Sequence, residues 1–384
     1  MPSPGGDHRE TGRVYRPLAT EMAIHRADYK RNFRFGYNPT RVAPGDLDFV
    51  GSPSSAARGR VTRGDIATSP DCDTNDQTMT NPTPAKMVWT VGELLTRTHE
   101  FFARQGVAEA RLSAELLLAH VLACTRLELY TRFERTVSPA DIAAFRELVR
   151  RRRDKMPVAY LIGQAWFYSL EFEVSPAVLI PRPETETLVE QTIQLARQAP
   201  AQTQVRILEL GVGSGCIAIA LAKNFPTAQL TGTECSAAAL DLAAKNARRH
   251  GVVERVRFLQ GDLFAPLEAL PPTPRFHITV SNPPYIPTAQ LDTLMPEVSG
   301  YEPRIALDGG ADGLAFYRRI AAEVPRWLEP DGVVLVETAF DQTPAVERIF
   351  SQTRWYAATR IIADAAGHPR CVLARRGPDC PPNR

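Results

Sequence analysis

The sequence lacks the features that would indicate a membrane span, a disulfide framework or a structural metal. It contains no run of 18 apolar residues, the length at which a membrane-spanning helix becomes a candidate. The six cysteines are widely spaced and form no Cys-x-x-Cys pair and no Cys/His cluster with zinc-ligand spacing. The N-terminus also lacks the apolar stretch of a secretory signal. We therefore expect a cytoplasmic protein with reduced cysteines and no bound metal.

An excess of charge of one sign is missing too. Lys and Arg number 45 against 43 Asp and Glu, which gives a formal net charge of +2. Domains that bind nucleic acid are typically far more basic, so nucleic acid is not an expected partner. The net charge does not exclude a local basic patch. The length of 384 residues and the hydrophobic content of 44% are sufficient for two or three domains with substantial cores.

The first 86 residues differ in composition from the rest of the chain. Residues 1–86 are rich in Pro, Gly, Ser, Thr and Asp and have no sustained hydrophobic period. Such a composition predicts disorder, because too little apolar surface is available for burial. The alternative is that translation starts at Met79 or Met87, so that 1–86 is a wrongly assigned start.

A helical pattern occupies residues 88–158. Thr90 followed by Glu93 is a capping-box signature and marks the first helix start. The segments "ARLSAELLLAHVLA" and "SPADIAAFRELVRRRRDK" place apolar residues three and four positions apart, as helices with one buried face do. This small helical bundle is either a structural cap or a docking platform for a macromolecule.

The remaining chain predicts a linker and an α/β domain. Within the linker, residues 159–186, the alternation in "LEFEVS" indicates a short hairpin. Strand and helix patterns then alternate over 187–377, and 378–384 form a tail. Strands are predicted at 205–210, 228–234, 255–260, 276–282 and 332–338, helices at 214–224, 236–250 and 313–328, and a pair of strands at the end. This order predicts a mostly parallel sheet covered by helices on both faces, with ligands bound beyond the carboxyl ends of the strands.

The segment "ELGVGSGC" follows the first strand of this domain. Gly211, Gly213 and Gly215 permit a tight turn and a close approach of the backbone to a ligand. Cys216 stands where a dinucleotide fingerprint requires glycine, which disfavours a pyrophosphate ligand. The turn suits a ligand without phosphates, such as S-adenosylmethionine (AdoMet), or it serves only packing.

Carboxylates follow the next two strands. Glu234 lies about 20 residues after the glycine turn, where an acid can accept hydrogen bonds from both ribose hydroxyls. Asp262 is placed to accept from an adenine amine, with the backbone of Leu263 against the ring; the alternative for Asp262 is a loop cap. Both residues are therefore candidates for cofactor binding.

The fourth strand ends in "SNPPYIP". Two acceptors, the side-chain oxygen of Asn282 and the carbonyl of Pro283, can grip the two N–H bonds of a planar amide or aromatic amine. Pro283 and Pro284 fix the backbone before the substrate arrives, and Tyr285 offers an aromatic face. A planar nitrogen is a poor nucleophile, so orientation is what its methylation requires. The alternative is a turn that is merely stiffened by proline.

These motifs together resemble one family. "LELGVGSG", "GDLF", "SNPPYIP", "VLIPRPETE" and "YEPRIALDGGADGLAFYRRI" resemble the HemK-type protein-glutamine methyltransferases, which modify class-I peptide-chain release factors, and the similarity runs from about Val88 to Arg376. It implies a small N-terminal helical-bundle domain and a seven-stranded, Rossmann-like AdoMet-dependent methyltransferase domain with a reversed last strand. It implies methylation of the glutamine side chain in the release factor's Gly-Gly-Gln motif, with docking through the helical domain.

The resemblance also implies roles for individual residues. Asn282 and Pro283 are catalytic, and together with Pro284 and Tyr285 they hold the glutamine. Leu179 is expected to line the same pocket. The cofactor site comprises Gly211, Val212, Gly213, Ser214, Gly215, Glu234, Asp262, Leu263, Asn282 and Thr185.

The chain departs from the family pattern at two of its strand ends. It has Glu234 where the family usually has Asp, and Ala339 where Glu-x-Gly is usual. We expect a monomer. A nucleic-acid adenine or cytosine amino-methyltransferase is an alternative, because an exocyclic amine presents the same planar NH2 group; a binding module with no catalytic activity is another.

Overall fold

The computed structural model describes residues 88–200, 203–271 and 273–378. The predictions for 1–86 and for most of the tail lie outside these residues. The account below concerns the unit that spans Trp89–Arg384. Within the described part of the chain, none of the helices is long and apolar enough to cross a membrane.

This unit begins with the predicted helical bundle, which consists of α2 (Val91–Arg104), α3 (Ala110–Val121), α4 (Arg126–Thr131) and α5 (Pro139–Arg153). The capping box at the start of α2 is confirmed, because the Glu93 N–H donates to Thr90 Oγ1 at 3.2 Å and the Thr90 N–H donates to Glu93 Oε2 at 2.9 Å. Phe102, Leu117 and Phe145 are fully buried between the helices. The bundle thus has a core of its own.

The hairpin predicted after the bundle is present. A short helix, α6 (Val158–Ile162), precedes strands β1 (Gln164–Phe167) and β2 (Leu170–Glu173), which pair antiparallel. Tyr168 and Ser169 between them both have positive φ, 50° and 61°, as a two-residue hairpin turn requires. A 3-10 turn, η1 (Pro183–Thr185), then leads directly into α7 (Glu186–Ala196).

A seven-stranded sheet forms the body of the unit. Its strands are β3 (Arg206–Leu210), β4 (Gln229–Glu234), β5 (Val256–Gln260), β6 (Phe276–Ser281), β7 (Leu328–Glu337), β8 (Tyr356–Ala363) and β9 (Pro369–Arg376). Their order is β5-β4-β3-β6-β7-β9-β8. The first five strands are parallel, whereas β9 is antiparallel to both β7 and β8. This confirms the predicted methyltransferase-type sheet with a reversed last strand.

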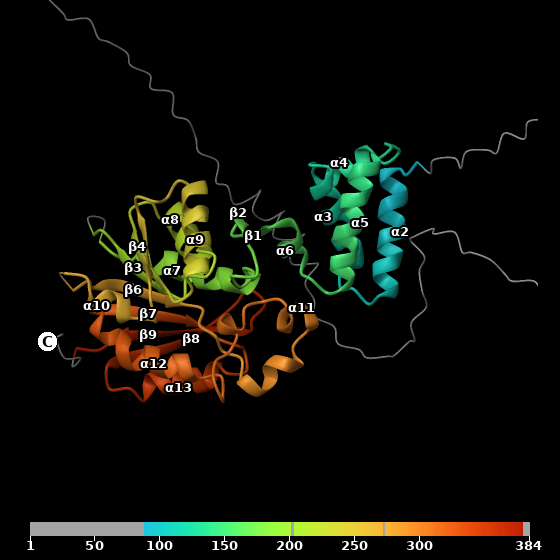
Figure 1. The fold of residues 1–384 in the computed structure, drawn as a ribbon. Coiled ribbons are helices and arrows are strands. Elements are labelled where there is room, and N and C mark those ends of the chain that lie inside the picture. Colours follow the sequence, from blue (N-terminus) through green and yellow to red (C-terminus); the bar gives the residue numbers. More distant parts are fainter. Residues whose placement is uncertain (1–87, 201–202, 272, 379–384) are drawn as a thin grey trace, which may run out of the picture. The chain divides into compact units, whose positions relative to one another are not determined.

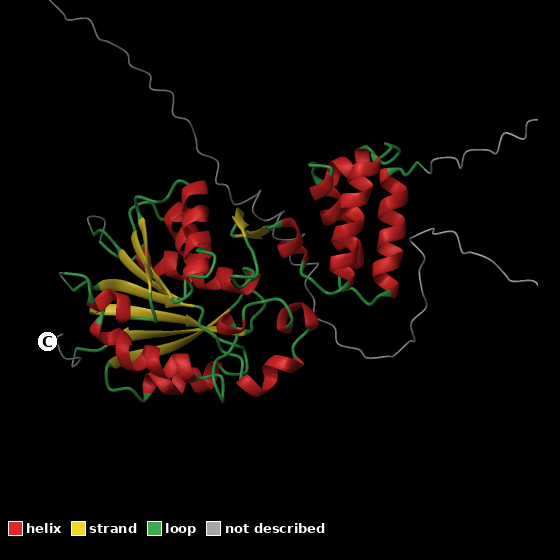
Figure 2. Ribbon diagram, in the orientation of Figure 1, coloured by secondary structure: helices red, strands yellow, loops and turns green. Residues whose placement is uncertain are grey.

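Helices cover both faces of the sheet (Figures 1 and 2). They include α8 (Cys216–Asn224), α9 (Ala237–Arg249), α10 (Ala265–Glu268), α12 (Ala315–Glu323) and α13 (Thr343–Ser351). Alternate residues of β7 contribute to two separate cores: Val333 and Leu335 pack with one cluster, and Val334 and Val336 with the other. This is why β7 reads as an unbroken apolar run from Val333 to Val336.

Three predicted boundaries were wrong. The helix predicted over 313–328 ends at Glu323, and β7 begins at Leu328 rather than at residue 332. Pro325 lacks the N–H that a continuing helix needs, so the chain turns there through a short 3-10 segment. The helix predicted from residue 214 begins at Cys216, because Gly215 adopts a left-handed conformation before it.

Candidate active site

The ends of four parallel strands lie in register and bring the predicted site residues together. Leu210 of β3 pairs with Thr233 of β4 and with Ser281 of β6, and Ser281 pairs in turn with Val336 of β7. The residues one position further along the chain form the next row, which we call the strand-end row: Gly211, Glu234, Asn282 and Glu337. Three of these four were predicted as site residues; Glu337 was not.

The glycine turn leaves open space beyond β3. Gly211 and Gly213 have φ values of 78° and 53°, and a Cβ added at either would meet nothing within 4 Å. Gly215 differs, because its Cβ would lie 3.2 Å from that of Ala243 on α9. The Gly213 N–H donates to Glu234 Oε2 at 3.0 Å, which ties the turn to the acid on the neighbouring strand.

Buried polar atoms without partners lie beside this turn. Glu209 on β3 is 1% exposed; its Oε2 accepts from the Ala218 N–H at 2.9 Å, and its Oε1 has no partner among the described residues. Ser214 Oγ is also buried and unpaired there. Burial raises the pKa of Glu209 well above its usual value. Sequence reasoning missed Glu209, although a carboxylate within the apolar strand "VRILEL" was a visible signal.

The two predicted cofactor acids already have protein partners. Glu234 Oε1 accepts from the Ser236 N–H at 2.9 Å. The two oxygens of Asp262 accept from the guanidinium group of Arg319 at 3.2 and 2.6 Å. Leu263 follows with a positive φ of 44° and a buried side chain. Each acid is therefore held in a defined orientation, and any ligand would share its oxygens with these donors.

The Asn-Pro-Pro-Tyr segment is held from both ends. The half-buried Asn282 donates through Nδ2 to Thr185 Oγ1 at 3.1 Å. At the other end, Gln342 Nε2 donates to the Tyr285 carbonyl at 2.9 Å. Cβ atoms added at Gly309 and Gly313 would lie 2.7 Å and 2.3 Å from backbone atoms of Tyr285. The loop "LDGGADG" therefore packs directly on this segment, which explains its glycines.

The ring of Tyr285 is less open than the sequence suggested. It packs partly against the buried cluster that contains Tyr317. Burial raises the pKa of the Tyr285 phenol, and the nearby Glu337 carboxylate raises it further. Only part of the aromatic face is thus left for a substrate.

Glu337 is a second residue near the site that the sequence reasoning overlooked. Its side chain is 1% exposed, and its Oε2 is buried with no hydrogen-bond partner among the described residues. Burial raises its pKa to about 7, against the lowering effects of Thr185, Arg370 and Arg182, while Glu184 adds to the rise. The signal available in the sequence was its position, because it ends a central strand as Asn282 does.

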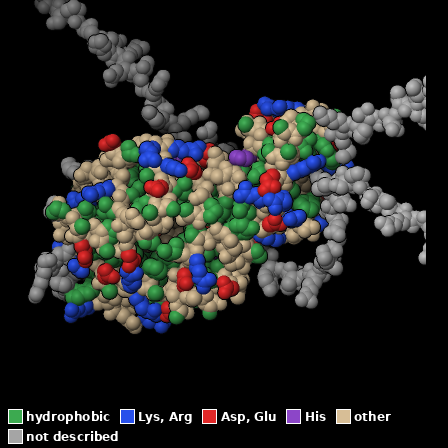
Figure 3. Space-filling view, viewed as in Figure 1, with side chains coloured by type: hydrophobic (Ala, Val, Ile, Leu, Met, Phe, Trp, Pro, Cys, Tyr) green, Lys and Arg blue, Asp and Glu red, His purple; other side chains and the backbone are tan. Residues whose placement is uncertain are grey.

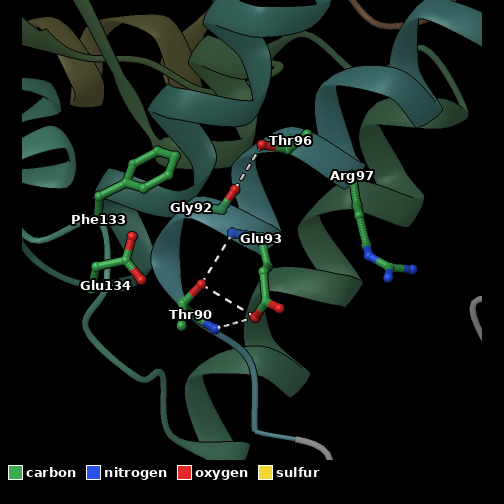
Figure 4. A pocket seen from close by; sticks show the side chains of 7 residues that line it. All are labelled: Thr90, Gly92, Glu93, Thr96, Arg97, Phe133 and Glu134. Carbon is green, nitrogen blue, oxygen red and sulfur yellow. Dashed lines mark hydrogen bonds between the residues drawn. The ribbon is translucent and has the colours of Figure 1, made fainter.

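Two other features do not join the strand-end row. Leu179 is half-buried on the segment before η1, and its predicted place in the pocket stays a prediction. A hollow of about 320 Å³ is built entirely from bundle residues (Figure 4): Thr90, Gly92, Glu93, Thr96, Arg97, Phe133 and Glu134. Several of its polar groups are used in fixing the start of α2, as in the 2.9 Å bond from Thr96 Oγ1 to the Gly92 carbonyl.

The described residues contain no group of three or more His, Cys, Asp or Glu side chains that could hold a metal ion. On the face drawn in Figure 3, acidic and basic side chains are interspersed.

Comparisons with known proteins define the class. Residues 188–296 match the family model described as "Methyltransferase small domain", and residues 93–163 match the "PrmC N-terminal domain". Together with the seven-stranded sheet, these matches make the protein a methyltransferase.

The curated relatives define the family. The chain is 47% identical over 290 residues to the release factor glutamine methyltransferase of Geobacter sulfurreducens, covering 76% of this chain and 98% of that protein. It is 42% identical over 283 residues to the enzyme of the same name from Chlorobaculum tepidum, covering 73% and 95%. The chain belongs to the family of release factor glutamine methyltransferases, and the resemblance found in the sequence is confirmed.

A solved structure is also similar. The release-factor-specific protein-(glutamine-N5) methyltransferase of Alicyclobacillus acidocaldarius is 30% identical, covers 54% of this chain and all of its own length, and gives a TM-score of 0.32.

Proposed function

We propose that this enzyme transfers a methyl group from AdoMet to the side-chain amide nitrogen of the glutamine in the Gly-Gly-Gln motif of class-I peptide-chain release factors. The observation that carries the proposal is the strand-end row. In a chain of this family, it aligns Asn282 with Gly211, the first residue of the open glycine turn.

The residues at the glycine turn fit AdoMet. The open space at Gly211 and Gly213 admits a ligand against the backbone, and the unpaired Glu209 Oε1 is an acceptor suited to an amine. The turn Gly211–Gly215 would hold the methionine part, Glu234 the ribose, and Asp262 with Leu263 the adenine. When bound, AdoMet supplies a methyl group on a positively charged sulfur, which is the chemical driving force.

The Asn-Pro-Pro-Tyr segment would orient the glutamine. Asn282 Oδ1 and the Pro283 carbonyl accept from the two N–H groups of the substrate amide, so that the nitrogen lone pair faces the methyl group. Held in this way, the amide nitrogen would take up the methyl group that AdoMet supplies, the electrons of the S–C bond would stay on sulfur, and the nitrogen would then lose one proton. Prolines 283 and 284 hold these acceptors in place beforehand, so little reorganisation remains for the transition state.

The helical bundle would dock the release factor, and the enzyme would act as a cytoplasmic monomer. A nucleic-acid substrate is not favoured, because acidic and basic groups are mixed on the face seen in Figure 3 and the net charge is only +2.

Transfer of labelled methyl groups tests the proposal. Purified enzyme and labelled AdoMet are incubated with a release factor, with its Gly-Gly-Gln→Gly-Gly-Ala variant, and with duplex DNA. We expect label on the wild-type factor alone. Label on both factors would place the methyl group on another residue, and label on DNA alone would overturn the assignment of the substrate.

A further inference from the structure

Two of the segments that resemble the family, "VLIPRPETE" and "YEPRIALDGGADGLAFYRRI", meet in the structure through one ion pair. Glu302 Oε1 accepts from the Arg182 guanidinium group, and Glu302 Oε2 accepts from the Ile180 N–H at 3.4 Å. The Glu302 side chain is 2% exposed and that of Arg182 is 33% exposed. Hydrogen bonds to a charged acceptor are about twice as strong as neutral ones. Both oxygens of one buried carboxylate therefore hold a single short stretch of chain.

The stretch around Arg182 depends on this carboxylate, because its own backbone can form few hydrogen bonds. Residues 179–182 belong to no helix or strand. Pro181 and Pro183 have no N–H, so the stretch cannot pair with a strand through a regular ladder. Its Ile180 N–H donates to the Glu302 side chain instead. A side chain from a distant segment thus fixes the path of the chain here.

The same stretch leads into the contact with Asn282. The Thr185 N–H donates to the Arg182 carbonyl at 3.1 Å in the turn η1, so a shift of Arg182 is passed on to Thr185 within three residues. Thr185 Oγ1 accepts from Asn282 Nδ2 at 3.1 Å. Residues 179–185, which we call the linker segment, therefore contact the Asn-Pro-Pro-Tyr segment directly.

Glu302 itself belongs to a loop that begins and ends beside the Asn-Pro-Pro-Tyr segment. The loop, residues 287–306, leaves after Ile286, and the Ile286 N–H donates to the Leu307 carbonyl at 3.0 Å where the chain returns. Within the loop, the Glu302 N–H donates to the Val298 carbonyl at 3.0 Å, which fixes its backbone. One carboxylate thus joins the linker segment to a loop that is anchored at the end of the Asn-Pro-Pro-Tyr segment.

We infer that Glu302, paired with Arg182, is a positioning residue that sets the separation between the linker segment and the Asn-Pro-Pro-Tyr segment. This separation determines the geometry in which Thr185 holds Asn282. The inference rests on the proposed function, in which Asn282 clamps the substrate amide. The contacts that Glu302 makes among the described residues lie in the linker segment and in its own loop, so its effect should reach kcat rather than AdoMet binding.

The substitution Glu302→Gln tests the inference, because it removes the charge and keeps the size of the side chain. It should lower kcat for methyl transfer to the release factor about 10- to 100-fold, the scale of loss that a displaced reacting group causes. AdoMet affinity, measured by calorimetry, should change less than about threefold. Urea unfolding establishes that the variant is folded under the assay conditions, so that lost stability does not account for a lower rate.

Glu329 provides a matched control. Its carboxylate also accepts from an arginine, Arg206, and its side chain is 26% exposed. This pair lies at the start of β3 and β7, at the opposite end of the parallel strands from the strand-end row. Glu329→Gln removes a charge from an arginine pair in the same way, and it should leave kcat unchanged.

A double-variant cycle tests whether Glu302 acts through Arg182. Arg182→Met alone should lower kcat to a similar extent. The double variant should be no more than about threefold slower than the slower single variant, because residues that act as a unit have non-additive effects. Losses that multiply would overturn the pairing. If Glu302→Gln does not fold, Arg182→Lys keeps both charges and changes only the geometry of the donor; a normal kcat in that variant overturns the inference.

The outcomes separate the inference from the proposed function. A wild-type enzyme that labels no release factor defeats the proposed function, and the inference with it. An active wild type with an equally active Glu302→Gln variant overturns the inference alone. Weaker AdoMet binding with a normal kcat also overturns it and assigns the linker segment to the cofactor. An equal loss of kcat in Glu302→Gln and Glu329→Gln overturns it as well, because the effect would then not depend on the place of the pair.

Discussion

Alanine at Gly213 should mainly weaken AdoMet binding, whereas alanine at Gly215 should mainly lower the stability of the fold. At Gly213, where φ is 53°, alanine costs about 1 kcal/mol of stability from the left-handed backbone alone, since its Cβ meets nothing within 4 Å. At Gly215, where φ is 81°, the added Cβ lies 3.0 Å from Ile219 Cδ1 and 3.2 Å from the Ala243 Cβ. Backbone strain and overpacking together cost about 2–4 kcal/mol there.

The loss of AdoMet affinity should be greater for Gly213→Ala than for Gly215→Ala, the reverse of the order for stability. The methyl group of Gly213→Ala projects into the space that we assign to AdoMet, and a misfit of about 1–3 kcal/mol weakens binding roughly 5- to 150-fold. Calorimetric titration with AdoMet gives the affinities, and urea unfolding gives the stabilities. Normal affinity in Gly213→Ala, or a greater loss of stability there than in Gly215→Ala, would refute the placement of the cofactor.

Three further predictions concern other parts of the molecule. Asn282→Ala should lower kcat at least about 100-fold with AdoMet affinity nearly unchanged, as binding and rate assays on one preparation can show; near-normal turnover would exclude the clamp. The Arg152 side chain is 6% exposed, and its Nη1 lies 3.3 Å from Glu297 Oε1. Arg152→Met should lower the free energy of unfolding in urea by about 3 kcal/mol. The matched change at the exposed Arg153, Arg153→Met, should lower it by less than about 1 kcal/mol. The raised pKa of Glu337, about 7, means that the folded protein retains a proton which the unfolded chain has released above its usual pKa of 4.5. Its contribution to stability therefore falls as the pH rises from 4.5 to 7, by on the order of 3 kcal/mol. Glu337→Gln should remove this dependence, and parallel unfolding curves against pH for the two proteins would contradict it.

Local patterns predicted the positions of the strand ends well. Glycines after one apolar run and Asn-Pro-Pro-Tyr after another are visible in the sequence, and the parallel sheet brings both to one edge. The partners of these residues were not predictable in the same way. Thr185 lies 97 positions before Asn282, and Gln342 lies 57 positions after Tyr285. No local period relates residues so far apart, because the sheet order alone makes them neighbours.

Glu337 illustrates the same limit. In the sequence it is one acid among 43 Asp and Glu residues, and only its position at the end of a predicted strand distinguishes it. Its burial arises because β7 lies inside the sheet, between β6 and β9, and Thr185, which lowers its pKa, comes from the segment before α7. The departure noted two residues later, Ala339, drew attention to this strand end for a different reason.

The place of β9 in the sheet has a consequence for folding during synthesis on the ribosome. β9 follows all the other described strands along the chain, yet it lies between β7 and β8. Until it emerges, β7 has an open edge and β8 has no neighbour in the sheet, although the glycine turn and the Asn-Pro-Pro-Tyr segment have already been made. Domains fold as units during synthesis. The nascent chain therefore carries the Asn-Pro-Pro-Tyr segment before it can complete the sheet that supports it, and we expect methyl transfer only after β9 has emerged.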